Sequence, residues 1–175
     1  MSYFRTGMLV LVTAVSLVRC GAPDSRDDAH LITHNDFESY GGWTSLPTLT
    51  DERAHSGRYS IKVTPQQPFG PSFSKPVGQF YHEGARRLKL EAYVYRDDPK
   101  AHVALIMAVH SPVDNSGLVY EEVAHTGESN AWWKLEKVIE LPEGLPEDAK
   151  FKLYAWMGDG RGAFYVDDVT LTRLP

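Results

Sequence analysis

The sequence is poor in features that define several large protein classes. It has one cysteine among 175 residues, so no disulfide can form within the chain. Its longest apolar run, residues 7–18, is too short to cross a membrane as a helix. Internal repeats and low-complexity tracts are absent. Disulfide scaffolds, repeat arrays and helical membrane proteins are therefore excluded as descriptions of this chain.

Catalytic motifs are also missing. There is no HExxH, GxSxG, phosphate loop or dinucleotide fingerprint. His102 and His110 share one face of a predicted strand but lie about 26 Å apart at ~3.3 Å per residue, too far for one metal ion. Asp167 and Asp168 are adjacent, and consecutive strand residues point to opposite faces, so they do not predict a glycosidase pair. The sequence does not predict an enzyme.

Residues 1–20 have the composition of an export signal, with Arg5 ahead of the apolar run. The run ends in Leu17-Val18-Arg19-Cys20, and a leucine three residues before a cysteine resembles the bacterial lipoprotein processing box. Arg19 departs from the small residue usual at that place. We expect a protein of the bacterial cell envelope, lipid-anchored through Cys20; otherwise Cys20 lies near an ordinary cleavage site and the protein is periplasmic or secreted.

Removing residues 1–19 leaves 16 basic and 23 acidic residues, a net charge of −7 with neutral histidines. This acidity argues against nucleic acid as a partner, because nucleic acid requires a basic face. The polar residues 21–30 are typical of a tether. The remaining residues 31–175 are enough for one domain, which must be stabilised without disulfides by core burial, by a metal ion or by both.

From residue 31 onward the sequence consists of short alternating runs separated by Gly, Pro, Asn or Asp. This pattern predicts an antiparallel β-sandwich of the jelly-roll type, with eight or nine strands in two sheets. The loop 39–57 leaves room for a short strand near 47–52. The main strands are expected near 31–38, 58–64, 73–80, 86–96, 101–110, 117–124, 132–141, 150–157 and 163–172.

The alternation also assigns residues to the two faces of each strand. The strand 101–110 turns Ala104, Ile106 and Ala108 outward, together with His102 and His110. The residues predicted to face the core are Leu88, Leu90, Ala92, Val94, Val103, Leu105, Met107, Val109, Trp133, Leu135, Ile139, Leu141, Phe151, Leu153, Ala155 and Met157.

The last predicted strand contains a change of phase. Phe164, Val166 and Asp168 share one face, but the following apolar positions are Val169 and Leu171. Such a one-residue slip predicts a β-bulge at the two acids. An inward carboxylate needs a cation or strong donors, because burying it unpaired is costly.

Several segments together resemble the galactose-binding-like jelly-roll superfamily, especially its bacterial carbohydrate-binding modules. The resemblance covers almost all of residues 31–173. The segments that carry it are Asn35-Asp36-Phe37-Glu38, Gly42-Trp43, Ala54-His55-Ser56-Gly57-Arg58-Tyr59-Ser60-Ile61, Trp133-Lys134, Leu141-Pro142 and Phe164-Tyr165-Val166-Asp167-Asp168-Val169.

This resemblance implies a structural Ca²⁺ that joins the two ends of the domain. By position, Glu38 and Asp168 would supply side-chain oxygens, and carbonyls of residues 52–56 would complete the shell, a donor set that Ca²⁺ accepts. The alternative is that both acids cap turns or pair with Arg53 or Arg58. The ion would stabilise the fold and take no part in chemistry.

In jelly-roll order, the strands 73–80, 101–110, 117–124 and 150–157 form one sheet. Its outer face would carry Tyr154, Trp156, His102 and His110 around a floor of small residues, and such rings can stack on sugars. Trp43 is a further candidate ligand residue. In the alternative, the 65–76 loop covers Trp156, and Trp43 plugs the core.

We therefore expect an exported, non-catalytic module that binds a polysaccharide through this face and meets the membrane only through its lipid anchor. The competing prediction is a structural or interaction module that packs against another cell-envelope protein. A polysaccharide lyase is less favoured, because it would need His102, Tyr154 and an arginine to converge on one point.

Overall fold

The computed structural model describes residues 31–39, 41–44, 47–81 and 86–175. The predicted signal 1–20, with Cys20, and the tether 21–30 lie outside the described residues. Among the residues described, no helix has both the length and the apolar character needed to cross a bilayer.

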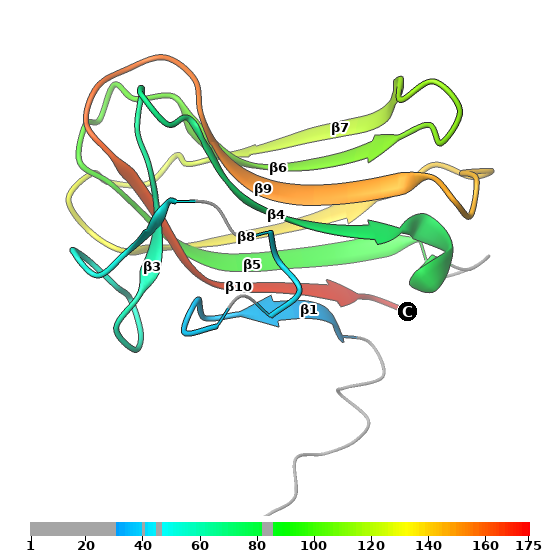
Figure 1. Ribbon diagram of the computed structural model, residues 1–175, viewed down its shortest axis with the longest axis horizontal. Coiled ribbons are helices and arrows are strands. Elements are labelled where there is room, and N and C mark those ends of the chain that lie inside the picture. Colours follow the sequence, from blue (N-terminus) through cyan, green and yellow to red (C-terminus); the bar gives the residue numbers. More distant parts are fainter. Residues whose placement is uncertain (1–30, 40, 45–46, 82–85) are drawn as a thin grey trace, which may run out of the picture.

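Two antiparallel sheets pack face to face, which confirms the predicted all-β sandwich (Figure 1). One sheet has the order β2-β3-β10-β5-β8, with β1 also paired to β10, and the other has the order β4-β9-β6-β7. The two-residue strand β2 brings the total to ten. The elements are β1 (Leu31–Asn35), β2 (Leu49–Thr50), β3 (Ser60–Val63), β4 (Phe69–Pro76), the 3₁₀ turn η1 (Val77–Gln79), β5 (Arg87–Arg96), β6 (Val103–His110), β7 (Gly117–Ala124), β8 (Trp133–Glu140), β9 (Lys150–Met157) and β10 (Phe164–Arg173).

The predicted grouping of four strands into one sheet is confirmed in β4, β9, β6 and β7. The predicted inward residues of β5, β6 and β9 are all buried in a single core between the sheets. In these strands the alternation of side chains therefore predicts correctly which residues are buried, because both sheets bury one complete face.

Two predictions along the chain are wrong. β4 begins at Phe69, four residues earlier than expected, and passes through Pro71. Proline is tolerated there because β4 is an edge strand, and the register with β9 shifts between Phe69 and Ser72. Trp133 has the inward phase of β8, yet 46% of it is exposed, because β8 is an edge strand and Trp133 is its first residue.

The predicted bulge in β10 is confirmed. The register between β10 and β5 shifts between Asp167 and Thr170, and Asp168 has φ of +49°. A left-handed backbone is unusual for a residue other than glycine, and a bulge is one of the places where it occurs. The prediction assigned the inward carboxylate to Asp168, whereas the fully buried acid is Asp167.

The first and last strands of the described domain are neighbours. β1 and β10 are antiparallel, with Leu31 opposite Thr172 and Asn35 opposite Val169 (Figure 1). The segment that enters the domain and the segment that leaves it therefore lie side by side.

Candidate functional site

The outer face of the sheet β4-β9-β6-β7 carries four large aromatic side chains, and we call it the aromatic face. Residues paired across neighbouring strands share a face, so the strand register places these rings. Phe69 of β4 lies opposite Trp156 of β9, and Tyr154 lies one pair further along β9. Tyr120 of β7 is paired with Ala108 of β6. The rings thus extend across the sheet from one edge strand to the other.

The small residues of β6 do not form an open floor. Ala104, Ile106 and Ala108 are at most 2% exposed and form a buried cluster against Tyr154 and Trp156. The two rings therefore lie over the small residues, which give them space to lie close to the sheet. The face is an aromatic platform, and the floor of small residues expected from the sequence lies beneath the rings.

Two residues of this face were not predicted from the sequence. Phe69 is 52% exposed and Tyr120 is 60% exposed, and Phe69 lies 6.1 Å from Tyr154 between ring centroids. Tyr120 alternates with Leu118 and Glu122 in β7, a signal that could have placed it on the outer face. The sequence could not place Phe69 on this face, because its proline-rich surroundings predict a connection and not a strand.

The predicted residue His102 belongs to the aromatic face. Its ring meets Trp156 edge-on with centroids 5.3 Å apart, and its Nε2 makes a short contact with the Glu122 carboxylate. Gly158 allows the indole of Trp156 to lie against the backbone, because a Cβ there would come within 2.7 Å of the ring. His102 and Glu122 thus place a polar pair beside the exposed rings.

Tyr154 is a partly buried ring of the face. Burial raises the pKa of its phenol, and the neighbouring Tyr120 raises it further. The hydroxyl therefore remains protonated across the physiological pH range and can donate a hydrogen bond.

Within the described residues, neither His110 nor Trp43 makes a ring contact with these four aromatic side chains. His110 lies at the end of β6, where its Nδ1 is 3.3 Å from the carbonyl of Asn115 in the turn to β7. Trp43 is 6% exposed, and its Nε1 donates to Thr33 Oγ1 at 3.3 Å. Its ring packs against Phe37 and Phe73, which supports the alternative that Trp43 plugs the core.

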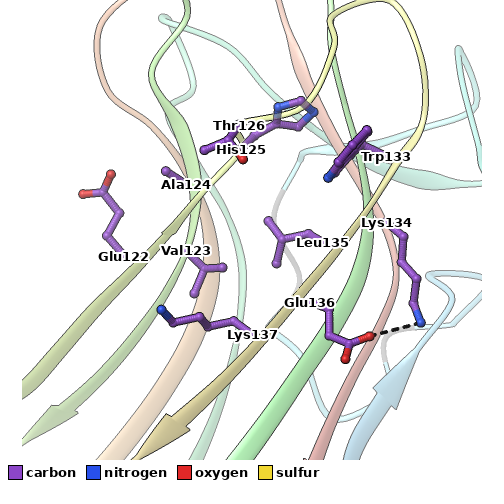
Figure 2. Close-up of a pocket in the computed structure, with 10 residues that line it drawn as sticks. All are labelled: Glu122, Val123, Ala124, His125, Thr126, Trp133, Lys134, Leu135, Glu136 and Lys137. Atoms are coloured by element: carbon purple, nitrogen blue, oxygen red, sulfur yellow. Dashed lines mark hydrogen bonds and ion pairs between the residues drawn. The ribbon is translucent and has the colours of Figure 1, made fainter.

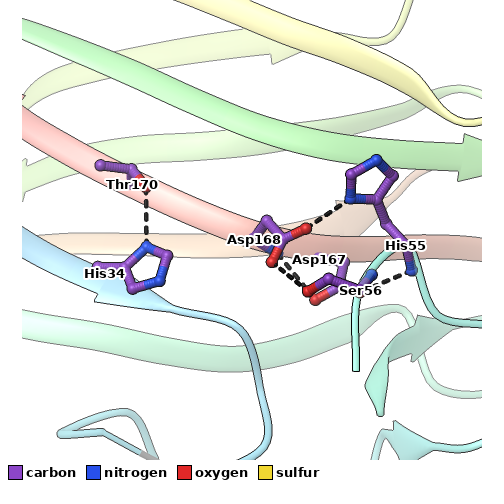
Figure 3. Close-up of polar contacts among 6 residues, drawn as sticks. All are labelled: His34, His55, Ser56, Asp167, Asp168 and Thr170. Carbon is purple, nitrogen blue, oxygen red and sulfur yellow. Dashed lines mark hydrogen bonds and ion pairs between the residues drawn. The ribbon is translucent and has the colours of Figure 1, made fainter. Parts of the chain in front are cut away.

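A second polar centre joins the two ends of the domain through the loop 52–59 (Figure 3). The Asp167 carboxylate accepts hydrogen bonds from the backbone N–H groups of His55 and Ser56 at 2.8 and 3.2 Å. The Asp168 carboxylate contacts the His55 ring at 2.5 Å and accepts from the Ser56 hydroxyl at 2.6 Å. Glu38 Oε1, beyond β1, accepts from the N–H groups of Arg58 and Tyr59. One loop therefore ties together the regions after β1 and within β10.

The charge of this centre is partly buried. Burial raises the pKa of Asp167 to about 6, although the N–H donors of His55, Ser56 and Asp168 act in the opposite direction. The same loop is anchored on the outer face of the sheet that contains β10, where His55 stacks on Tyr93 of β5 at 3.5 Å and Arg53 lies 4.0 Å over Tyr95.

The oxygens at this centre are of the kind that Ca²⁺ prefers. Glu38 and Asp168 reach the same loop from opposite ends of the domain, as the calcium prediction requires. Among the described residues, however, no group of three or more His, Cys, Asp or Glu side chains is placed to hold a metal ion. Backbone carbonyls would have to supply the remaining ligands, and the calcium ion stays a prediction.

A lyase would need an arginine beside His102 and Tyr154. Within the described part of the chain, His102 contacts Glu122 and Trp156, and Tyr154 contacts Phe69. No described arginine makes a hydrogen bond, ion pair or ring contact with either residue, so nothing in this arrangement favours that chemistry.

Comparisons with known proteins find similarity in structure and not in sequence. No protein-family model matches the chain, and no curated protein matches it. The C-terminal family 22 carbohydrate-binding module of Clostridium thermocellum Xyn10B superposes with a TM-score of 0.63 at 18% identity, covering 87% of this chain and 96% of that one. The shared property is the fold.

Two further modules show the same likeness. The first xylan-binding family 22 domain of Paenibacillus barcinonensis Xyn10C gives a TM-score of 0.58 at 19% identity and covers 82% of this chain and 94% of its own. A family 16 carbohydrate-binding module gives 0.54 at 17% identity, with 78% and 94% covered. The chain therefore has the β-sandwich of carbohydrate-binding modules over nearly their whole length.

Proposed function

We propose that this protein is a non-catalytic module that binds a polysaccharide on the aromatic face. The observation that carries the proposal is the arrangement of Phe69, Trp156, Tyr154 and Tyr120 across one sheet, with two of the rings more than half exposed. The similar structures are described as xylan-binding or carbohydrate-binding modules, which makes a β-linked plant polysaccharide the first ligand to test.

The chemistry of the face suits a sugar chain. Aromatic rings stack on the apolar C–H faces of sugar rings, and each stack contributes about 0.5–1.5 kcal/mol beyond burial. Neighbouring polar groups, here His102 with Glu122 and the Tyr154 hydroxyl, can hydrogen-bond to the sugar hydroxyls. Two or three such contacts give a dissociation constant of about micromolar to millimolar.

The competing function is docking to another cell-envelope protein. A protein interface would favour a flat, continuous apolar patch. On this face the aromatic residues share their rows with polar residues: Ser72 is paired with Tyr154 across β4 and β9, and Ser74 is paired with Lys152 in the next row. This polar interruption favours a hydroxyl-rich ligand.

Isothermal titration with xylohexaose, cellohexaose and soluble xylan tests the proposal. Trp156→Ala removes the ring that covers Ala104 and contacts His102, so we expect affinity to fall by about tenfold or more. Val113→Ser is the control, because Val113 is 93% exposed in the β6–β7 turn and far along the sheet from Trp156. Binding that survives in Trp156→Ala at the wild-type level, or no binding to any of these glycans, would contradict the proposal.

We further propose that Ca²⁺ at the Glu38–Asp168 centre stabilises the module, and that Cys20 carries a lipid that holds it at the bacterial cell envelope. The calcium proposal is supported by the two carboxylates that meet one loop from both ends of the domain. The anchor proposal is supported by the sequence of residues 1–20 alone. Metabolic labelling with a palmitate analogue, compared with Cys20→Ser, tests the anchor.

A further inference from the structure

A pocket of about 390 Å³ opens at the edge of the sandwich, between the edge strands β7 and β8 (Figure 2). It is formed by residues 122–126 on one side and residues 133–137 on the other. Its volume lies in the range of ligand sites in proteins. This pocket is separate from the rings of the aromatic face, although Glu122 borders both.

Trp133 forms one end of the pocket and is held in place by Gly127. A Cβ on Gly127 would come within 2.4 Å of the indole, so the ring lies directly against the backbone of this glycine. The indole is nevertheless 46% exposed and has no ring contact or hydrogen bond with the rest of the described chain. A tryptophan supported on one side and open on the other is suited to stacking on a ligand.

His125 lies at the same end of the pocket and is 4% exposed (Figure 2). Both of its ring nitrogens are buried without a hydrogen-bond partner. A buried polar group without a partner is costly and calls for a bound water or ligand. Because burial lowers its pKa, the imidazole is neutral and offers one donor and one acceptor.

Lys137 lies at the other end, and its ammonium has no hydrogen bond or ion pair with the residues that the structure describes. The other charges around the pocket are already paired, Lys134 with Glu91 and Glu136. Between the two ends, the buried side chains of Val123 and Leu135 form an apolar floor. The pocket therefore combines an open indole, an apolar floor and polar groups without partners.

We infer that this edge pocket is a second saccharide-binding site, in which Trp133 stacks on a sugar ring. Lys137 and the open indole N–H donate to sugar oxygens, and His125 is reached directly or through one water. That the ligand is a saccharide rests on the proposed function. The residues of this pocket, apart from Glu122, are different from those of the aromatic face. Two sites on one module would let it hold two chains, or two parts of one chain, at once, which raises the overall avidity.

The four tryptophans allow one experiment to separate the two sites. In ¹⁵N-labelled protein each indole N–H gives one resonance, assigned by single Trp→Phe variants. Trp156 reports on the aromatic face and Trp133 on the edge pocket. Trp43 is an internal control, because it is buried and bonded to Thr33. The probes are xylohexaose, cellohexaose and mannohexaose, each up to about 10 mM to cover weak ring stacking.

We expect the Trp133 resonance to shift with its own saturation curve and to do so also in Trp156→Ala, while Trp43 stays fixed. A shift of Trp156 without Trp133 would overturn the second site and leave the proposed function standing. A shift of Trp133 alone would contradict the aromatic face and support the edge pocket. A Trp133 shift that disappears in Trp156→Ala would also overturn the second site.

Two substitutions test the support of the indole. Gly127→Ala adds a methyl group where the ring lies, so we expect affinity at the edge pocket to fall about tenfold with the Trp156 response unchanged. Val138→Ser is the matched control, because Val138 is 41% exposed on the same strand with the opposite phase. Equal affinity in Gly127→Ala and Val138→Ser would refute the role of the Trp133 platform.

Discussion

Asp167 offers the sharpest test of how the two ends of the domain are joined. Its carboxylate is fully buried and accepts hydrogen bonds from three backbone N–H groups, those of His55, Ser56 and Asp168. Asp167→Ala removes the acceptor for all three donors. A donor left without a partner costs about 1–3 kcal/mol when it stays buried.

The net loss of stability should lie at the lower end of the range that three unpaired N–H donors would give together. His55 and Ser56 belong to a partly exposed loop, so water can reach their N–H groups after the substitution. The raised pKa of Asp167 also means that burying this carboxylate carries a cost, which the alanine variant does not have. We therefore expect a loss of about 3 kcal/mol in the free energy of unfolding. For a domain of this size, that loss lowers the melting temperature by about 10 °C.

Thermal and urea unfolding, followed by tryptophan fluorescence, measure this difference. Asp167→Asn keeps one acceptor oxygen, so it should lose about half as much stability. Asp114→Ala is the control, because Asp114 also accepts a hydrogen bond from a backbone N–H, that of Ser116, but in an exposed turn. The unfolding midpoint of this variant should stay near that of the wild type. An Asp167→Ala midpoint equal to that of Asp114→Ala would refute the reasoning, because the loop would then be held without the carboxylate.

Two further predictions concern the calcium ion and pH. After removal of divalent ions with EDTA, added Ca²⁺ should stabilise the protein by about 2.7 kcal/mol at a hundred times its dissociation constant. Calorimetry should show this shift in wild type and not in Asp168→Asn; equal melting temperatures with EDTA and with Ca²⁺ would contradict the site. Burial, and to a smaller extent Arg96, lowers the pKa of His125 below its unfolded value near 6.5. The unfolded state therefore binds more protons below about pH 6.5, and stability falls as the pH drops through that range. His125→Phe should flatten this dependence in urea titrations between about pH 5 and 7; an unchanged slope would show that other groups cause it.

Much of the fold follows from local alternation in the sequence. In β5, β6 and β9 every second residue enters the core, and the grouping of β4, β6, β7 and β9 follows from jelly-roll order. The bulge in β10 was also predictable, because Val169 and Leu171 continue the apolar pattern one residue out of phase with Val166. These features follow from the two-residue alternation of side chains along a strand.

The features that the sequence did not reveal depend on position within the sheets. Trp133 has the inward phase, but an edge strand has no neighbour to enclose its first residue, so the ring is half exposed. Phe69 lies in a strand that contains Pro71, which only an edge position allows. The sequence placed Ala104, Ile106 and Ala108 on the face of Tyr154 and Trp156, but that the two rings cover these residues depends on the register between β6 and β9, which no single run of sequence carries.

The pairing of Leu31 with Thr172 has a mechanical consequence. A force that pulls the two ends of the domain apart acts across the hydrogen bonds of β1 and β10, and antiparallel neighbours loaded at the same end open one bond at a time. Such unzipping needs less force than sliding two strands past each other, where the bonds must break together. Once β1 has opened, resistance to further tension would depend on the hydrogen bonds that the N–H groups of Arg58 and Tyr59 donate to Glu38, just past the far end of β1.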